Sequence, residues 1–211
     1  MTKNIFLDTS VIIAHHFKYD SVQLRRIQEL AQSDDAHLVT TSIVVAEVEA
    51  NIRKRVDQLG AHLKRLRKEH PIAKNITAPA LWSTTETFDP ALVCEQLIAQ
   101  FHDYLGKSNT DLVDLDGASA QEVFDWYFKQ LAPFGCGEKK HEFPDAFTIS
   151  ALEHWCAARG EQLYVVAGDG DLADYCKRSE RLIRLSRRAE FIDTYMRQTT
   201  ALEFINEPSA E

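Results

Sequence analysis

Five acidic residues lie inside or beside apolar segments of the chain, where a carboxylate is costly to bury without a partner. They are Asp8 in NIFLDTS, Glu47 in TTSIVVAEVEAN, Asp145 in EFPDAFTISAL, and Asp169 and Asp171 in YVVAGDGDLADYC. Carboxylates that come together repel one another unless a cation neutralises them. Carboxylate oxygens are the ligands that Mg²⁺ and Mn²⁺ prefer, and no Cys/His ligand set is evident. The five residues therefore predict a Mg²⁺ or Mn²⁺ site, which would suit chemistry on phosphates.

Segments between the acids have the composition of alternating strands and helices. Short apolar segments predict strands at 4–8, 37–42, 162–169 and 182–186, with a short strand or a turn within 112–119. Helices are predicted at 19–33, 43–69, 91–105, 119–131, 144–159 and 187–200, and the segment 72–90 is predicted to connect two of them. Strands separated by helices indicate an α/β fold with a three-layer α/β/α arrangement and a mainly parallel central sheet.

The strand ends predict where the acids meet. In open parallel sheets, ligands bind beyond the carboxyl ends of the strands. Asp8 follows the apolar residues IFL and Asp169 follows YVVAG, so both are expected at that edge although they are far apart in the sequence.

Composition narrows the class of protein. A chain of 211 residues that is 45% hydrophobic is enough for one sizeable domain. We expect a single domain over residues 1–205, with a helical insertion at about 70–132 and a frayed tail at 206–211. The four cysteines form no CxxC pair, so reduced thiols in a cytoplasmic protein are expected. No segment approaches the roughly 20 apolar residues of a membrane span, so no membrane association is predicted.

The acidic motifs resemble those of PIN domains, a family of metal-dependent ribonucleases. The matching motifs, in the family's order, are LDTS (7–10), TSIVVAE (41–47), PDAFTISAL (144–152) and GDGDLADYC (168–176). Each motif alone is short, but four in order with the expected strand or helix context are specific. The segment KKHEFPDAF is most similar to an uncharacterised bacterial PIN-like subgroup with a Lys-Lys-x-Glu-Phe-x-Asp-Ala signal. Extra helical material and an enlarged loop before Pro144 distinguish the chain from compact toxin-type PIN domains.

This resemblance implies roles for the individual residues. The acidic cluster of Asp8, Glu47, Asp145, Asp169 and Asp171 would hold one or two Mg²⁺ or Mn²⁺ ions and activate water for attack on phosphorus. Asp8, Asp145 and Asp169 are expected as direct ligands, whereas Glu47 would ligate or orient water and Asp171 would act through water. Further residues expected to support the site or contact substrate are Thr9, Ser10, Asn51, Lys139, Lys140 and Glu142.

Each of these residues also has an ordinary structural explanation. Asp8 could cap the segment after it, and Asp145 suits the positive end of a helix dipole. Asp169 and Asp171 could be turn residues around Gly170. Lys139, Lys140 and Glu142 could belong to a solvated loop, and Asn51 could be a surface residue. The functional interpretation depends on all of the acids occurring together in the family's order.

The expected activity is endoribonuclease cleavage of RNA, with a role as a toxin or defence effector. Such enzymes commonly form homodimers and are silenced by a small antitoxin-type protein. A net charge of −8 argues against a grip on nucleic acid by overall charge. Two basic stretches could nevertheless guide a phosphate backbone: Arg53–Lys68 in the long helix and Lys177–Arg188 near the C-terminus. Solvated helix faces are the ordinary explanation for such stretches.

Three alternatives compete with this interpretation. A PIN-like scaffold could bind RNA or protein without cutting, although such proteins typically lose one or more acids. A DNA-directed flap-type nuclease shares the architecture but usually has more acids and a helical arch. A phosphatase of the haloacid-dehalogenase type also opens with a strand ending in Asp. That family requires a second Asp two residues later, where this chain has Ser10.

Overall fold

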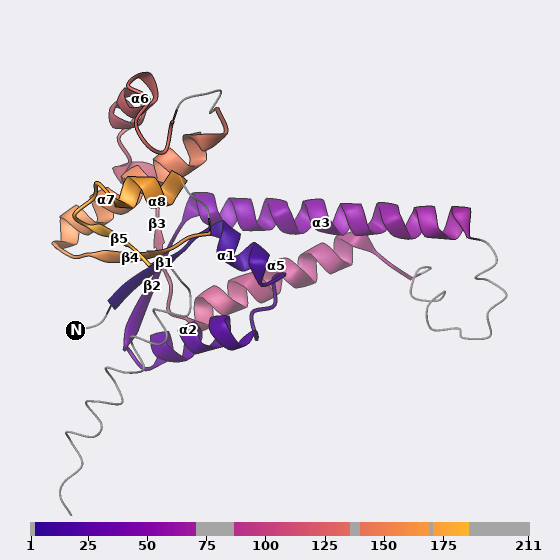
Figure 1. Cartoon of the computed structure of the whole chain (residues 1–211). Coiled ribbons are helices and arrows are strands. Elements are labelled where there is room, and N and C mark those ends of the chain that lie inside the picture. Colours follow the sequence, from indigo (N-terminus) through magenta and orange to yellow (C-terminus); the bar gives the residue numbers. More distant parts are fainter. Residues whose placement is uncertain (1–2, 71–86, 136–139, 169–170, 186–211) are drawn as a thin grey trace, which may run out of the picture.

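A five-stranded parallel sheet forms the centre of the protein (Figure 1). The computed structural model describes residues 3–70, 87–135, 140–168 and 171–185. The strands are β1 (Lys3–Leu7), β2 (Ala36–Thr41), β3 (Asp111–Val113), β4 (Leu163–Val166) and β5 (Leu182–Arg184), in the order β3-β2-β1-β4-β5. Every neighbouring pair is parallel, which confirms the predicted α/β fold with a parallel central sheet.

Helices cover both faces of this sheet. They are α1 (Thr9–Ala14), α2 (Val22–Gln32), α3 (Ser42–Glu69), α5 (Pro90–Lys107), α6 (Ala120–Phe128), α7 (Phe143–Arg159) and α8 (Asp171–Cys176), with 3₁₀ turns η2 (Leu115–Gly117) and η3 (Lys140–Glu142). In Figure 1, α6, α7 and α8 lie above the sheet and α2 and α5 lie below it. Because both faces are covered, the central strands are apolar along their length rather than alternating.

The central strand β1 forms the middle of the core. Ile5 and Phe6 are fully buried, as are Val39 of β2 and Val165 of β4. In the register of the sheet, Ile5 pairs with Leu38 and Phe6 pairs with Val165. The edge strand β3 is fixed by α7, because Asp111 accepts hydrogen bonds from the Trp155 indole at 3.2 Å and the Arg159 guanidinium at 3.1 Å.

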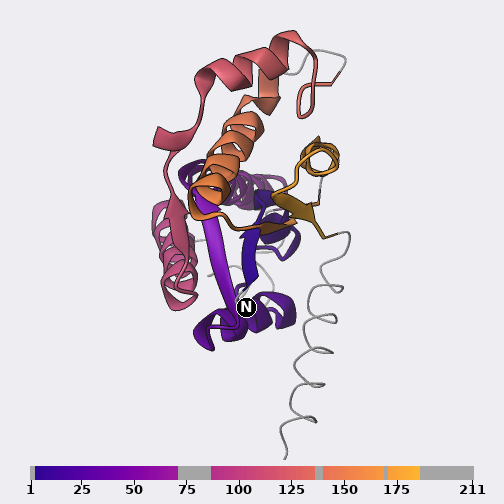
Figure 2. The same ribbon diagram turned by 90° about the vertical axis from the view of Figure 1, so that its left-hand side faces the viewer.

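Helix α3 is much longer than the sheet that it leaves, and with α5 it forms an arm (Figure 1). Its buried stripe consists of Val44, Val48, Ile52, Val56 and Gly60 at steps of four residues. A Cβ atom at Gly60 would lie 3.3 Å from the Phe88 ring, so the absence of a side chain allows the close approach of the segment that begins α5. In Figure 2 the arm recedes behind the sheet.

Polar contacts also hold the arm together. Glu49 of α3 accepts hydrogen bonds from Arg53 at 2.8 Å and contacts the His102 ring of α5 at 2.9 Å. These hydrogen bonds, first that from Arg53, hold the pKa of the Glu49 carboxyl below its ordinary value. The structure confirms the helix predicted over 43–69, since α3 begins one residue earlier and ends at the same residue.

Several predicted boundaries differ from the structure. The helix predicted at 19–33 begins only at Val22, because residues 18–21 form a turn in which the Ser21 N–H donates to the Lys18 carbonyl. The helix predicted at 119–131 ends at Phe128, and Gln130 has a left-handed backbone with φ of 52°. The strand predicted at 162–169 ends at Val166, where pairing with β1 stops.

Two further predictions concern the helical insertion and the segments that the structure does not describe. The range 70–132, predicted as a helical insertion, also supplies β3 to the central sheet. The connection predicted at 72–90 and the helix predicted at 187–200 lie largely or wholly outside the described residues, as does the tail at 206–211. In the described part of the chain, none of the helices has a hydrophobic stretch long enough to cross a bilayer.

Candidate active site

Asp8 lies directly after the central strand, at the carboxyl edge of the sheet. Its backbone N–H donates to the Val166 carbonyl of β4 at 3.0 Å, which continues the sheet pairing by one residue. Its side chain caps α1, because Oδ2 accepts a hydrogen bond from the Ser10 N–H at 2.9 Å. The residue is only 7% exposed, and none of the described residues donates to Oδ1. The cap therefore uses one oxygen of a buried carboxylate and leaves the other for a further partner.

Glu47 is connected to the Asp8 segment by Thr9. The Thr9 hydroxyl Oγ1 donates to Glu47 Oε2 at 2.7 Å, across 38 residues of sequence. A hydrogen bond to a carboxylate is stronger than one between neutral groups. Thr41 ends β2 and begins α3, since its side chain accepts from the Val44 N–H at 3.3 Å. The strand end thus sets the start of α3, and Thr9 fixes the position of the Glu47 carboxylate.

The end of β4 is held against the same segment. The Gly168 N–H donates to Ser10 Oγ at 2.9 Å. A Cβ atom at Gly168 would lie 2.9 Å from that same oxygen, so the absence of a side chain permits this contact. Asp169 follows directly but lies outside the described residues. Asp171 is the first residue of α8, and its side chain is likewise outside the described part of the structure.

Asp145 lies in the first turn of α7 and is half-buried. Pro144, at the start of the helix, occupies a position where its missing N–H costs nothing. Three residues after Asp145, and so on the same helical face, the Thr148 hydroxyl lies 3.5 Å from that of Thr41. Because Thr41 ends β2, this contact places the beginning of α7 beside the carboxyl edge of the sheet.

Two of the remaining predicted residues, Asn51 and Glu142, have described side chains. Asn51 lies one turn after Glu47, but its amide donates to the Glu47 carbonyl at 2.9 Å within the helix. Glu142 is the residue before α7 and forms no side-chain cap. Lys139 lies outside the described residues, and of Lys140 only the backbone, in η3, is described.

The donor set at this edge consists of carboxylates and hydroxyls. Such hard oxygen ligands suit Mg²⁺ or Mn²⁺ rather than a softer metal. Among the described residues, no group of three or more His, Cys, Asp or Glu side chains is close enough to hold a metal ion. Asp8, Glu47 and Asp145 are among these residues and by themselves form no such group, whereas the side chains of Asp169 and Asp171 lie outside the described part of the structure. The predicted five-acid cluster therefore stays a prediction. The chemistry of the described donors is compatible with it.

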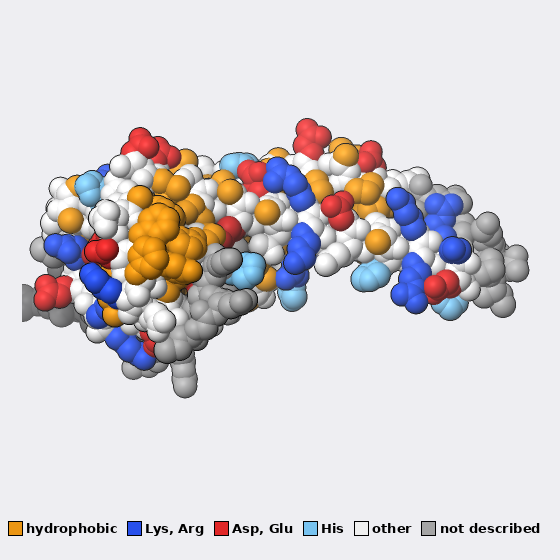
Figure 3. Space-filling view, turned by 90° about the horizontal axis from the view of Figure 1, so that it is seen from above, with side chains coloured by type: hydrophobic (Ala, Val, Ile, Leu, Met, Phe, Trp, Pro, Cys, Tyr) orange, Lys and Arg blue, Asp and Glu red, His pale blue; other side chains and the backbone are white. Residues whose placement is uncertain are grey.

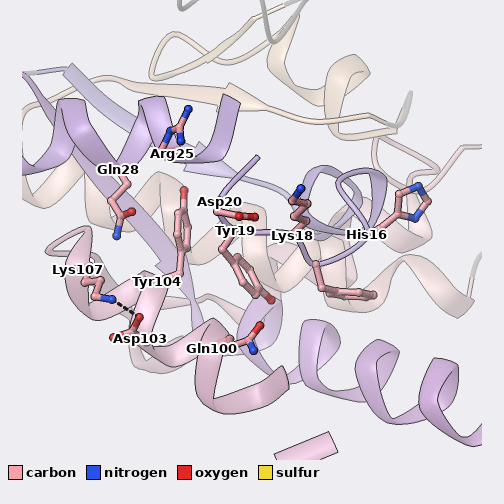
Figure 4. Close-up of a pocket in the computed structure, with 11 residues that line it drawn as sticks. His16, Lys18, Tyr19, Asp20, Arg25, Gln28, Gln100, Asp103, Tyr104 and Lys107 are labelled. Atoms are coloured by element: carbon pink, nitrogen blue, oxygen red, sulfur yellow. Dashed lines mark hydrogen bonds and ion pairs between the residues drawn. The ribbon is translucent and has the colours of Figure 1, made fainter. Parts of the chain in front are cut away.

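A separate cavity of about 480 Å³ lies at the other end of α1. Tyr19 and Tyr104 face it, together with charged residues that include Lys18 and Arg25 (Figure 4). The Tyr19 hydroxyl is buried and has no hydrogen-bond partner among the described residues. Since Asp8 caps the N-terminus of α1 and this cavity follows its C-terminus, the cavity is distinct from the acidic edge.

Sequence reasoning missed two contacts that shape the site. Thr148 has no sequence signal except its place one turn after Asp145, and Gly168 is marked only by its place in the motif GDGDLADYC. A Thr directly after an apolar strand, as at Thr41, is the kind of signal that could have suggested a cap at the edge.

Comparison with known proteins identifies one protein family whose sequence profile matches this chain. The sequence profile of the PIN domain matches residues 5–172, which include Asp8, Glu47, Asp145 and Asp169. No curated protein and no solved structure matched significantly.

Proposed function

The chain belongs to the PIN-domain family, and on that premise we propose that it is a metal-dependent nuclease that hydrolyses the phosphodiester bonds of RNA. PIN domains are generally nucleases. The observation that carries the proposal is the hydrogen bond from Thr9 to Glu47, at 2.7 Å. It links the helix that carries one acid to the residue directly after Asp8, at the edge where parallel sheets bind ligands.

The proposed ligands are oxygen atoms from separate elements. Asp8 follows β1, Glu47 lies on α3 and Asp145 lies on α7, with Asp169 and Asp171 as further members. The set fits a hard divalent ion, because every side chain in it is a carboxylate. Bound Mg²⁺ or Mn²⁺ would supply the charge and the activation of water that phosphodiester hydrolysis requires.

The neighbouring residues would act by positioning. Thr9 would hold one oxygen of Glu47, and Ser10 would hold the segment that leads to Asp169. Partners that orient ligating carboxylates typically change metal affinity or activity by about 10- to 100-fold when they are removed. Lys139 or Lys140, which precede α7 in the sequence, would contact the scissile phosphate.

RNA rather than DNA is the substrate that the family resemblance favours. A role as a toxin or defence effector, a homodimer and a small inhibitor protein stay predictions, since each depends on partners outside this chain.

Purified protein incubated with labelled RNA and single-stranded DNA, with Mg²⁺, Mn²⁺ or EDTA, would test the proposal. We expect RNA cleavage that requires metal and falls by about a hundredfold or more in Asp8→Asn and in Asp145→Asn, because ligands contribute at least as much as their supporting partners. Asp103→Asn is the matched control, since Asp103 is an exposed acid on α5 paired with Lys107. Circular dichroism would show that each variant is folded.

Two outcomes would contradict the proposal. One is cleavage by Asp8→Asn and Asp145→Asn at the wild-type rate, because the acids would then have no part in the reaction. The other is the absence of cleavage with either metal while RNA still binds, which would favour the non-catalytic scaffold.

A further inference from the structure

The arm formed by α3 and α5 carries a basic segment in an otherwise acidic protein. Residues Arg53–Glu69 of α3 contain seven Lys and Arg residues but only two acids, a net charge of +5 in a chain whose net charge is −8. Figure 3 shows the Lys and Arg side chains gathered in two groups along the arm. The remainder of the molecule would repel a polyanion, so attraction to one depends on local surfaces such as this.

Three lysines on this helix form a stripe, and we name Lys54, Lys64 and Lys68 the lysine stripe. All three are exposed, and none forms an ion pair with another described residue. By contrast, Arg53 is paired with Glu49 at 2.8 Å and Arg65 with Glu69 at 2.9 Å. At 100° per residue, spacings of ten and fourteen residues keep the three lysines within about 80° of one another around the helix.

The lysine stripe continues from the acidic edge of the sheet. Lys54 follows Glu47 by seven residues, nearly two full turns, so the two side chains leave the helix within about 20° of each other. A rise of 1.5 Å per residue puts Lys54 about 10 Å and Lys68 about 32 Å from Glu47 along the axis. By the same count Lys68 lies about 60° and Lys64 about 100° from Glu47 around the helix, so the lysine stripe starts beside the proposed catalytic edge and turns partly away from it along the arm.

Packing and polar contacts hold α3 in place as far as Gly60. Val56 is buried at 4% exposure, Gly60 packs against Phe88, and Glu49 bridges to His102 of α5. The buried positions of α3 run from Val44 to Gly60, so the described packing fixes the part of the helix that carries Lys54, and Lys64 and Lys68 follow on the same continuous helix. Charges on one helix keep a fixed spacing, which lowers the entropy lost on binding.

We propose that the lysine stripe binds the sugar-phosphate backbone of a nucleic-acid strand that leads away from the scissile bond. This inference rests on the proposed nuclease function and adds a requirement for substrate length. At about 3.4 Å per nucleotide, a stacked strand needs roughly nine nucleotides to reach from Glu47 to Lys68. Lysine suits this role because its ammonium is a point charge on a flexible stem, able to meet repeating phosphates without reading bases.

Binding without cleavage gives the most direct test. The background is Asp8→Asn with EDTA, and fluorescence anisotropy measures the affinity for labelled strands of 4 and 24 nucleotides, as RNA and as DNA. The test variant replaces Lys54, Lys64 and Lys68 with Gln, which keeps the helix propensity. The control replaces Lys3, Lys107 and Lys129 with Gln and so removes the same charge elsewhere.

We expect the test variant to bind the 24-nucleotide strands roughly tenfold more weakly at physiological salt. The slope of log affinity against log salt should become shallower by about two, since each phosphate contact on a single strand contributes about 0.7. The difference from the background protein should shrink for the 4-nucleotide strands. RNA and DNA should lose affinity alike, because the backbone is what is bound.

An unchanged salt slope for the 24-nucleotide strands would overturn the proposal, as would an equal loss in the control variant. Competition by polyglutamate as strong as that by RNA at equal charge would also overturn it, because any polyanion would then suffice. This binding test does not depend on cleavage. If the protein fails to cleave RNA but the Lys→Gln variant loses affinity as expected, the proposed nuclease function is refuted while nucleic-acid binding by the lysine stripe is supported.

Discussion

Thr9 is the residue through which two acidic positions are joined, and it is 7% exposed. Thr9→Val keeps the side-chain shape but leaves Glu47 without this donor. We expect a loss of about 2 kcal/mol in the free energy of unfolding, because the hydrogen bond has a charged acceptor. If the proposed function holds, RNA cleavage should fall about 10- to 100-fold.

Urea unfolding and cleavage rates would measure both effects of the Thr9 variant. Thr9→Ser retains the hydroxyl and is the control, so it should keep most of the activity. Equal cleavage by the Val and wild-type proteins would show that the orientation of Glu47 has no role in the reaction.

Gly168 shows how little space the loop after β4 has. Gly168→Ala would bring a Cβ atom to 2.9 Å from Ser10 Oγ, so the Ser10 hydroxyl must turn away or the loop must shift. Losing the Gly168 hydrogen bond should cost about 1 kcal/mol. In a double-mutant cycle, adding Gly168→Ala to Ser10→Ala should cost clearly less than adding it to the wild type. Additive effects would mean that the two residues do not interact.

Among the elements, the arm depends on the contact between α3 and the beginning of α5. Gly60→Ala gains about 1 kcal/mol of helix propensity, but its Cβ meets the Phe88 ring at 3.3 Å. These effects oppose each other, so we expect a net change within about 1 kcal/mol. Gly60→Leu overfills the contact and should destabilise the protein by roughly 1–3 kcal/mol.

Chemical denaturation of both Gly60 variants would test this account of the arm. Nucleic-acid binding should weaken in Gly60→Leu as well, because the lysine stripe would lose its support. A Leu variant as stable as the wild type would show that the packing of α5 on α3 is loose.

At the scale of the whole molecule, two buried thiols make the free energy of unfolding depend on pH. Burial raises the pKa of the Cys156 thiol to about 12 and that of Cys176 to about 11, from an ordinary value of 9.0. Above pH 9 the unfolded chain therefore loses these protons while the folded chain retains them. The stabilising effect is complete below pH 9 and is lost as the pH rises towards 11–12.

We expect the free energy of unfolding to fall from about pH 9 towards pH 11, and to fall less steeply in Cys156→Ala and Cys176→Ala. Urea titrations at several pH values would measure these slopes. In the folded protein at neutral pH, a maleimide reagent should modify the half-buried Cys94 faster than either buried thiol. Identical slopes in all variants would argue that the thiols do not titrate differently on folding.

Local pattern in the sequence was sufficient to predict the order of most of the strands and helices, although it left the segment that contains β3 open between a strand and a turn. Apolar residues at 4–8, 37–42 and 162–169 favour buried strands, and steps of three or four predict the long helix at 43–69 within one residue of its observed start. These features depend on neighbouring residues, because burial periodicity is a property of a single segment. The acidic motifs in the family's order also required only the sequence, and the PIN-domain match confirms the family.

Tertiary structure alone decided which of those segments touch. The contacts from Thr9 to Glu47, Ser10 to Gly168 and Thr41 to Thr148 join residues 38 to 158 positions apart. It also decided that α3 leaves the sheet with α5 beside it, since a helical pattern specifies a buried face but not the partner that covers it. The physical reason is that long-range contacts result from packing the whole core, to which every element contributes, whereas a strand or a helix start depends on a few consecutive residues.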